Sequence, residues 1–308
     1  MTKFSRFQVS RRSFIRQCAA TAAATGLPLW FVQRETAGAT AGEKAPSAND
    51  RPRIGLVGCG GMGRGDAGNA SRFGDIVALC DVDATHAAAA AKQFTKAGKT
   101  PQQYGDFRKL LERRELDIIL TGTPDHWHTL VNLAAIRAGK DVFGQKPLTL
   151  TIDEGKRMVS AVHQHKTVFQ TGSQQRSDAR FRLACELVRN GRLGKIKEVT
   201  VWLPAGLREG PFAAQPVPAG LNWDFWLGQA PKVEYLPQRC HLFFRYWYDY
   251  AGGTMTDWGA HHNDIVLWAL GLPGPVEVEA KALAQPIAGG YTAISEYDAR
   301  FRYSNDVV

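Results

Sequence analysis

A glycine-rich loop between an apolar run and a predicted helix is the feature that most constrains the fold of this chain. Arg53 to Val57 has the composition of a buried strand, and Gly58-Cys59-Gly60-Gly61-Met62-Gly63 leads from it into a helix that we expect to end near Phe73. A second predicted strand, Ile76 to Cys80, is followed by Asp81. This order of strand, spaced glycines, helix and acidic residue is typical of a dinucleotide-binding βαβ unit.

Each residue of this pattern has a physical task. Gly58 permits a tight turn, Gly60 lets the backbone approach a pyrophosphate, and Gly63 allows the helix to pack closely on the strand. Asp81 can accept hydrogen bonds from both ribose hydroxyls, and its charge would repel a 2′-phosphate. We therefore predict NAD as the cofactor in preference to NADP, although Arg64 would assist a phosphate. Met62, in the same loop, completes this part of the predicted cofactor site.

Alternating strands and helices continue along the first half of the chain. Predicted helices cover 84–97, 106–114 and 126–138, and predicted strands cover 117–121 and 141–143. This spacing implies parallel βαβ units, so the expected fold class is α/β with a Rossmann domain over residues 52–150.

A different pattern follows in residues 151–308, the predicted second domain. Thr151 and Glu154 form a capping box for a helix ending near His165. We expect strands at 168–171 and 196–203, helices at 179–189 and 258–270, and an irregular stretch rich in Gly, Pro and Trp over 204–237. Strands at 276–282 and 293–303 indicate an antiparallel sheet. Because no closing element follows them, we expect the chain to be part of a longer reading frame.

The first 41 residues have the order of a twin-arginine signal peptide. Ser10-Arg11-Arg12-Ser13-Phe14 precedes a weakly apolar run from Cys18 to Val32, and small residues around Ala39 suit a signal peptidase. The run is shorter and less hydrophobic than the stretch of roughly 20 apolar residues that a membrane-spanning helix needs, so we predict no stable membrane anchor. The expected location is the periplasm, reached through the twin-arginine export machinery, with residues 42–51 as a linker.

Charge argues against a nucleic-acid partner. The net charge is +9, but six basic residues against one acidic residue in 1–41 contribute +5, which leaves only +4 for the remainder. Beyond the signal, Cys59, Cys80, Cys185 and Cys240 show no CxxC spacing and are interpreted as small apolar residues.

Lys146 is the first candidate reactant. It follows a predicted parallel strand, Asp141 to Phe143, and Pro147 fixes the backbone after it. Ligands of such sheets bind in the crevice outside the carboxyl ends of the strands, so we expect the lysine to point there. A partly desolvated ammonium would hold a substrate hydroxyl and ease its deprotonation.

Asp257 and His261 form the second candidate group. A spacing of four residues places both on one face of a helical turn, about 5–6 Å apart at Cβ. We predict His261 as the general base, with Asp257 orienting its ring or binding a second hydroxyl. The alternative is a core histidine with Asp257 as a helix N-cap.

Taken in order, these motifs resemble the Gfo/Idh/MocA oxidoreductase family. The resemblance covers residue 52 to the end and rests on the glycine motif, Thr123-Pro124 leading to His128, Gln145-Lys146-Pro147, and Asp257-Trp258-Gly259-Ala260-His261. It implies a Rossmann domain followed by an α+β domain with an open, mainly antiparallel sheet, in a homo-oligomer that transfers hydride on sugars or polyols. It also implies that Thr123, Pro124 and Gln145 contact the cofactor and that His128 lines the nicotinamide pocket. Gln145 stands where the family usually has Glu, which removes a charge beside Lys146.

Two further residues are candidates for substrate binding. Arg176 follows a predicted strand end and could bind sugar hydroxyls or be a solvated arginine. Trp258 belongs to a group of aromatics that are mostly expected in the core, although aromatic faces also stack on pyranose rings. The pairs His126/His128, His163/His165 and His261/His262 have no third ligand at zinc-site spacing, so we predict no metal.

The sequence therefore predicts an exported, NAD-dependent oxidoreductase acting on a sugar, polyol or sugar derivative. Outside the inner membrane the cofactor would have to be bound tightly and regenerated in place. The alternatives are an NAD-dependent glycosidase that works by transient oxidation and elimination, and a non-catalytic sugar-binding relative.

Overall fold

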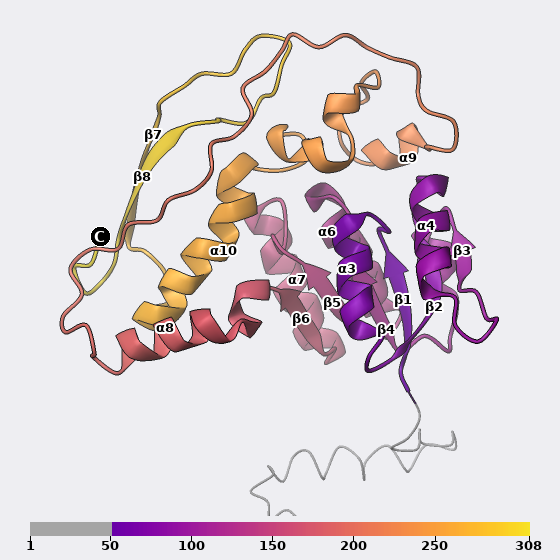
Figure 1. The fold of residues 1–308 in the computed structure, drawn as a ribbon, viewed down its shortest axis with the longest axis horizontal. Helices are drawn as coiled ribbons and strands as arrows, with labels where there is room; N and C mark the ends of the chain where they lie inside the picture. Colours follow the sequence, from indigo (N-terminus) through magenta and orange to yellow (C-terminus); the bar gives the residue numbers. More distant parts are fainter. Residues whose placement is uncertain (1–50) are drawn as a thin grey trace, which may run out of the picture. The chain divides into compact units, whose positions relative to one another are not determined.

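The computed structural model describes residues 51–308 (Figure 1). The predicted twin-arginine signal and nearly all of the predicted linker lie outside the described residues. Within the described part, every helix is too short or too polar to cross a lipid bilayer.

A parallel sheet lies in the first half of the described chain, as the sequence predicts, and it has six strands. The strands follow the order β3-β2-β1-β4-β5-β6, so successive strands are added on one side of β1 up to β3 and on its other side from β4 onwards. Such a change of side opens a crevice at the carboxyl ends of β1 and β4. Their bounds are Arg53–Val57 for β1, Asp75–Cys80 for β2, Gln102–Tyr104 for β3, Ile118–Thr121 for β4, Asp141–Gln145 for β5 and Phe169–Gly172 for β6. Because β6 pairs with β5, the sheet extends beyond residue 150.

Helices cover both faces of this sheet (Figure 1). On one face, α3 (Gly61–Ala70) and α4 (Ala84–Phe94) bury Ile54 and Leu56 of β1. On the other face, α5 (Phe107–Leu111), α6 (Asp125–Arg137) and α7 (Ile152–His165) pack near Val57. Successive side chains of a strand point to opposite faces, so one short strand contributes to both cores.

The second half contains helices and an antiparallel strand pair. A short 3-10 turn, η2 (Gln174–Ser177), leads into α8 (Ala179–Arg189), which lies beside α10 (Gly253–Leu270) (Figure 1). The strands β7 (Glu277–Ala282) and β8 (Tyr297–Arg302) pair over their full length. Between α8 and α10, the chain forms α9 (Trp223–Leu227), η3 (Pro237–Arg239) and η4 (His241–Tyr246).

The strand predicted at 196–203 is wrong. Val199 N donates to Val308 O (2.9 Å) and Val308 N donates to Lys197 O (3.3 Å), but no ladder forms there. Strand β3 and helix α9 are not predicted from the sequence. In α9, Asn222 caps the helix by accepting a hydrogen bond from Phe225 N (3.0 Å). Helix α10 begins five residues before the predicted start, with Gly252 as its N-cap and Gly253 as its first residue.

The two halves are joined next to Asp81. Ala84 N donates to Gly220 O (3.0 Å), and Asn222 N donates to Val82 O (2.9 Å). An aromatic core that includes Trp223, Trp226, Trp247 and Tyr250 lies beyond this junction. The irregular segment is therefore anchored to the end of β2, where it closes one side of the crevice.

Candidate functional site

A cavity of about 470 Å³ occupies the crevice at the carboxyl ends of β1, β4 and β5. Loops after these strands form its floor, and residues of α9, η4 and α10 form its opposite wall. Most of the residues predicted to contact the cofactor line it: Gly58, Gly60, Met62, Asp81, Thr123, Pro124, His128, Gln145 and Lys146. A cavity of this size and lining is suited to a small molecule.

The glycine loop needs residues without side chains for two reasons: the backbone packs closely at Gly58 and Gly63, and Gly60 faces the cavity. Gly58 has φ +88°, and a Cβ there would lie 2.5 Å from the carbonyl carbon of Gly122. A Cβ on Gly63 would overlap the carbonyl oxygen of Gly58, so the start of α3 can approach β1 this closely only without a side chain. At Gly60 a Cβ would meet only His86, at 4.0 Å, because the residue faces the cavity. The loop thus presents backbone amides and a helix N-terminus to the cavity, an arrangement that binds phosphate.

Asp81 connects the end of β2 to this loop. Its Oδ2 accepts a hydrogen bond from Cys59 N (2.6 Å), and its Oδ1 accepts one from Asp83 N (2.9 Å). The carboxylate also lines the cavity. It is therefore held in place at the end of the cavity where the βαβ pattern expects a ribose.

Lys146 and Asp257 form an ion pair at another part of the cavity wall. Lys146 Nζ donates to Asp257 Oδ1 (2.5 Å) and to the Asp257 carbonyl (3.2 Å). The lysine side chain is 9% exposed, and Arg245 Nε lies 3.4 Å from the same carboxylate oxygen. Burial acts to raise the pKa of Asp257, but the hydrogen bond and charge of Lys146, with Arg245, outweigh burial and hold that pKa below its ordinary value.

His261 lies one turn after Asp257 on α10 and is buried. Its Nδ1 is a buried atom without a hydrogen-bond partner among the described residues. Burial, followed by the charge of Lys146, lowers the pKa of His261. A neutral imidazole at neutral pH can accept a proton, as the predicted base requires, although His261 does not line the cavity itself.

Two profiles of one protein family match the chain. Residues 52–173 match the Gfo/Idh/MocA profile described as an oxidoreductase family with an NAD-binding Rossmann fold. Residues 196–303 match the profile of the same family's C-terminal alpha/beta domain. The chain belongs to the Gfo/Idh/MocA oxidoreductase family. Its Rossmann domain is accordingly an NAD-binding one.

Curated relatives match over slightly less than half of the chain. Glycosyl hydrolase family 109 protein 2 of Shewanella sp. (strain ANA-3) is 34% identical over 158 residues, which are 47% of this chain and 35% of the relative. Myo-inositol 2-dehydrogenase of Thermotoga maritima is 28% identical over 145 residues, which are 46% of this chain and 42% of the relative. The match thus spans less than half the length of either relative.

Solved structures share the fold over a longer stretch. The WlbA dehydrogenase from Bordetella pertussis, crystallised with NADH and UDP-GlcNAcA, covers 83% of this chain with a TM-score of 0.60. The aligned part is 68% of that protein, and the sequences are 20% identical. At this identity the likeness concerns the fold of the two domains.

Gln145, where the resemblance to the family leads us to expect Glu, is the last residue of β5. Its Nε2 donates to Asp66 Oδ2 of α3 (2.6 Å), and its Oε1 accepts a hydrogen bond from Lys146 N (3.0 Å). Burial raises the pKa of Asp66, although the hydrogen bond from Gln145 opposes this effect. A carboxylate at residue 145 would face that of Asp66, so the amide and the acid on α3 form a complementary pair.

His128 fixes the loops that carry the predicted site. Its Nδ1 lies 2.7 Å from Pro147 O, and its Nε2 lies 2.8 Å from Thr123 O. The ring thus links the loop after β4 to the loop after β5, directly beside Lys146. It lines the cavity, as the resemblance implies, and it also positions neighbouring backbone.

Two charged residues that line the cavity, Asp125 and Arg245, are not predicted as site residues from the sequence. Asp125, in the first turn of α6, is buried, and this burial raises its pKa to about 7 against the opposing charges of Arg245 and Lys146. Its position directly after Thr123-Pro124 at a strand end was the available signal. Arg245 reaches Asp257 from η4, and nothing in the surrounding aromatic sequence distinguishes it.

The predicted substrate residues lie away from this cavity. Arg176 makes a bidentate ion pair with Asp264, with Nε–Oδ2 and Nη2–Oδ1 distances of 2.6 and 2.8 Å. Trp258 is 44% exposed, and its ring centroid is 6.4 Å from that of His261. Neither residue lines the 470 Å³ cavity, so a substrate role for them requires a ligand that extends towards the exposed side of α10.

Proposed function

We propose that the protein is an NAD-dependent oxidoreductase that acts on a CH–OH group of a sugar, polyol or sugar derivative. The observation that carries this proposal is the single cavity shared by the glycine loop, Asp81 and the Lys146–Asp257 pair. One part of the cavity wall has the features that bind a dinucleotide, and another part carries the Lys146–Asp257 acid–base pair. Membership of an oxidoreductase family and the likeness to inositol and sugar-nucleotide enzymes support the same reaction class.

The residues present fit the cofactor. The side-chain-free surface at Gly58 and Gly60 and the first turn of α3 would hold the pyrophosphate, and Asp81 would hold the adenosine ribose. Thr123, Pro124, His128 and Gln145 border the adjoining part of the cavity. When bound, NAD⁺ would supply the acceptor for a hydride.

The protein's own groups would manage the proton and the orientation of the substrate. The Lys146 ammonium, held by Asp257, would donate a hydrogen bond to the reacting hydroxyl and favour its deprotonation. The proton would pass to neutral His261, which lies one turn after Asp257 and close enough to Lys146 for the lysine's charge to lower its pKa. Arg245 would keep Asp257 ionised while Lys146 turns towards the substrate.

Export is the second element of the proposal. The twin-arginine pattern of residues 10–16 would direct the folded protein to the periplasm with its cofactor already in place. A compartment without free dinucleotide would require tight binding and regeneration of NAD within the site. The partners would then be the export machinery, a sugar-like substrate and further copies of the chain in a homo-oligomer.

An NAD-dependent glycosidase is the second candidate function. It is favoured by the 34% identity to a glycosyl hydrolase family 109 protein over 158 residues. In such a reaction, oxidation of one carbon would acidify the neighbouring C–H bond, and the aglycone would leave by elimination. Water would then add to the resulting double bond, and the hydride first removed would be returned to the carbonyl. The same Lys146 and His261 groups would serve both reactions.

The decisive experiment is to determine the mass and redox state of the nucleotide that copurifies with the folded protein. A screen of sugars, polyols and aryl glycosides would follow, with nicotinamide absorbance and sugar products recorded together. Accumulation of reduced nucleotide with an oxidised sugar would support the oxidoreductase. Release of the aglycone without net reduction would support the glycosidase, and failure to bind NAD in calorimetry would contradict both.

A further inference from the structure

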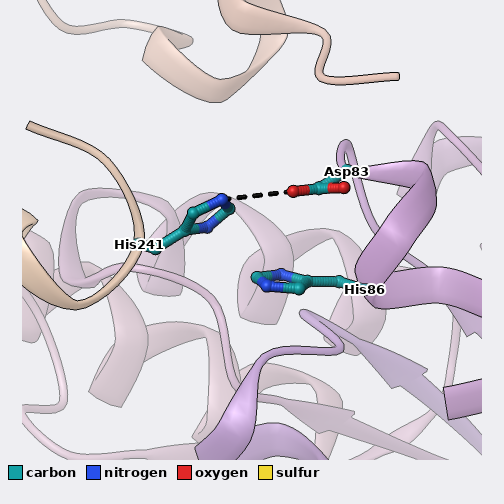
Figure 2. A group of neighbouring side chains, drawn as sticks. All are labelled: Asp83, His86 and His241. Carbon is teal, nitrogen blue, oxygen red and sulfur yellow. Dashed lines mark ion pairs between the residues drawn. The ribbon is translucent and has the colours of Figure 1, made fainter. Parts of the chain in front are cut away.

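We propose that Asp83, His86 and His241 form a binding site for a divalent transition metal of the Zn²⁺ type at the edge of the cavity. Figure 2 shows the two imidazoles and the carboxylate facing a common space. Each residue offers one ligand atom, and these atoms lie within 4.8 Å of one another. The proposal concerns the protein without nucleotide and does not depend on the proposed reaction.

Asp83 and His86 are brought together by the first turn of α4. Asp83 is the N-cap, and its Oδ1 accepts a hydrogen bond from Thr85 N (2.8 Å). Its Oδ2 is then available, and this oxygen lies 3.1 Å from His241 Nε2 (Figure 2). His86 is three residues further on, which places its side chain on the same side of the helix start.

His241 comes from a distant segment and adopts an unusual backbone conformation. It is the first residue of η4, with φ +49°, in the left-handed region that β-carbon-bearing residues occupy only at a cost. In this conformation its ring lies beside that of His86, with centroids 4.4 Å apart and planes inclined by 52°. A strained residue that carries a metal-binding side chain to two others is more readily explained by a ligand than by packing.

The donor set matches the chemistry of zinc and related ions. Two neutral imidazoles and one carboxylate are a common catalytic zinc set, and they leave positions for water or another ligand. Asp81 lies next to this set, with its Oδ2 3.8 Å from His86 Nδ1, and adds negative charge beside the site. His86 and His241 also line the cavity, so a bound small molecule could reach the metal.

The site can be tested by titrating ZnCl₂ into the untagged, chelator-treated full chain in a calorimeter, without nucleotide. We expect one saturable site per chain. Asp83→Asn retains a good N-cap while removing the carboxylate, and His241→Asn suits the left-handed backbone. Each is expected to weaken Zn²⁺ binding by more than about 100-fold, which exceeds the loss caused by removing a residue that only orients a ligand. Co²⁺ in place of Zn²⁺ should give visible d–d bands that both variants lose.

His163→Ala is the matched control, because His163 and His165 form an exposed pair at the end of α7. This variant should bind Zn²⁺ as the parent does. Circular dichroism and melting temperatures identify any variant that fails to fold, and the other variant then decides the question. Unsaturable binding, unchanged affinity in a folded Asp83→Asn or His241→Asn protein, or loss of binding in His163→Ala would overturn the proposal.

Discussion

Lys146 and Asp257 are 111 residues apart in the sequence, yet Nζ of the lysine lies 2.5 Å from Oδ1 of the aspartate. The lysine follows β5 of the Rossmann sheet and the aspartate lies in the second turn of α10. This ion pair therefore connects the nucleotide-binding half of the protein to the half that would bind the substrate. Because the pair is largely buried, removal of one partner would leave the other as an uncompensated charge.

Replacing the lysine tests whether this pair has a chemical role. Lys146→Met should lower kcat/KM by roughly 100- to 10,000-fold, the usual contribution of a proton-transfer group, while NAD affinity changes much less. Steady-state kinetics with the substrate found by screening, together with calorimetry of NAD, would separate these effects. Lys156→Met on the exposed side of α7 is the control and should change neither kcat/KM nor NAD affinity. Equal loss of NAD binding and turnover would instead assign Lys146 to the cofactor.

The glycine loop offers an internally controlled test of close packing. A Cβ at Gly63 would overlap the Gly58 carbonyl oxygen, whereas a Cβ at Gly65 meets nothing within 4 Å. Both residues lie in α3. Gly63→Ala should destabilise the protein by at least about 2 kcal/mol and weaken NAD binding, because α3 must move away from β1. Gly65→Ala should stabilise it by about 0.5–1 kcal/mol.

Urea unfolding followed by circular dichroism would measure both free energies of unfolding. Both substitutions are Gly→Ala and lie in one helix. Changes of opposite sign in the free energy of unfolding therefore could not come from helix propensity. If Gly63→Ala were as stable as Gly65→Ala and bound NAD normally, the packing argument for the nucleotide loop would be wrong.

Local patterns explain why so much of the first half was predictable. The sequence from Arg53 to Asp81 contains a strand, a turn that needs glycine and a strand end, and each of these signals acts within a few residues. The capping box at Thr151 is equally local, and both of its hydrogen bonds form. The parallel sheet then follows from general rules for connecting such units.

Contacts between distant segments explain what could not be predicted. Arg245 reaches Asp257 only because η4 is held against α10, and the approach of His241 to Asp83 requires the junction of residues 220–222 with Val82. Neither contact leaves a spacing signal in the sequence. The missing strand at 196–203 has the same origin, since a strand needs a paired neighbour as well as an alternating pattern.

Asp81 should determine how tightly NAD binds and how strongly NAD is preferred to NADP. Asp81→Asn retains a hydrogen-bonding oxygen for Cys59 N but removes the charge. We expect NAD to bind about 10- to 100-fold more weakly, as the loss of a charge-assisted hydrogen bond implies, and NADP to lose less or to gain. Calorimetry with both nucleotides measures this ratio, and exposed Asp75→Asn is the control. An unchanged ratio would place the ribose elsewhere.

If His261 is the general base, its protonation should determine how kcat/KM depends on pH. Burial and the charge of Lys146 lower its pKa, so the neutral base persists below its ordinary titration range near pH 6.5. The acidic limb of kcat/KM should therefore fall below pH 6.5. His261→Ala should abolish this limb and lower turnover, whereas the neighbouring His262→Ala should retain it. An acidic limb at or above pH 7 would exclude His261 as the base.

Asp125 should make the stability of the protein depend on pH in the opposite sense from most aspartates. Its folded-state pKa, about 7, is above that of an unfolded aspartate, so the folded protein holds the proton more tightly. The stabilisation by the protonated form is complete below about pH 4 and is lost as the pH rises through about 7.

The amide in Asp125→Asn mimics the protonated acid at every pH. This variant should therefore be more stable than the parent at pH 8, by on the order of 1–4 kcal/mol, and the difference should shrink steadily as the pH is lowered to 5. Urea unfolding of both proteins at several pH values gives this difference directly, because contributions from other groups cancel. A constant difference would mean that Asp125 is ionised throughout and that Arg245 and Lys146 compensate fully for its burial.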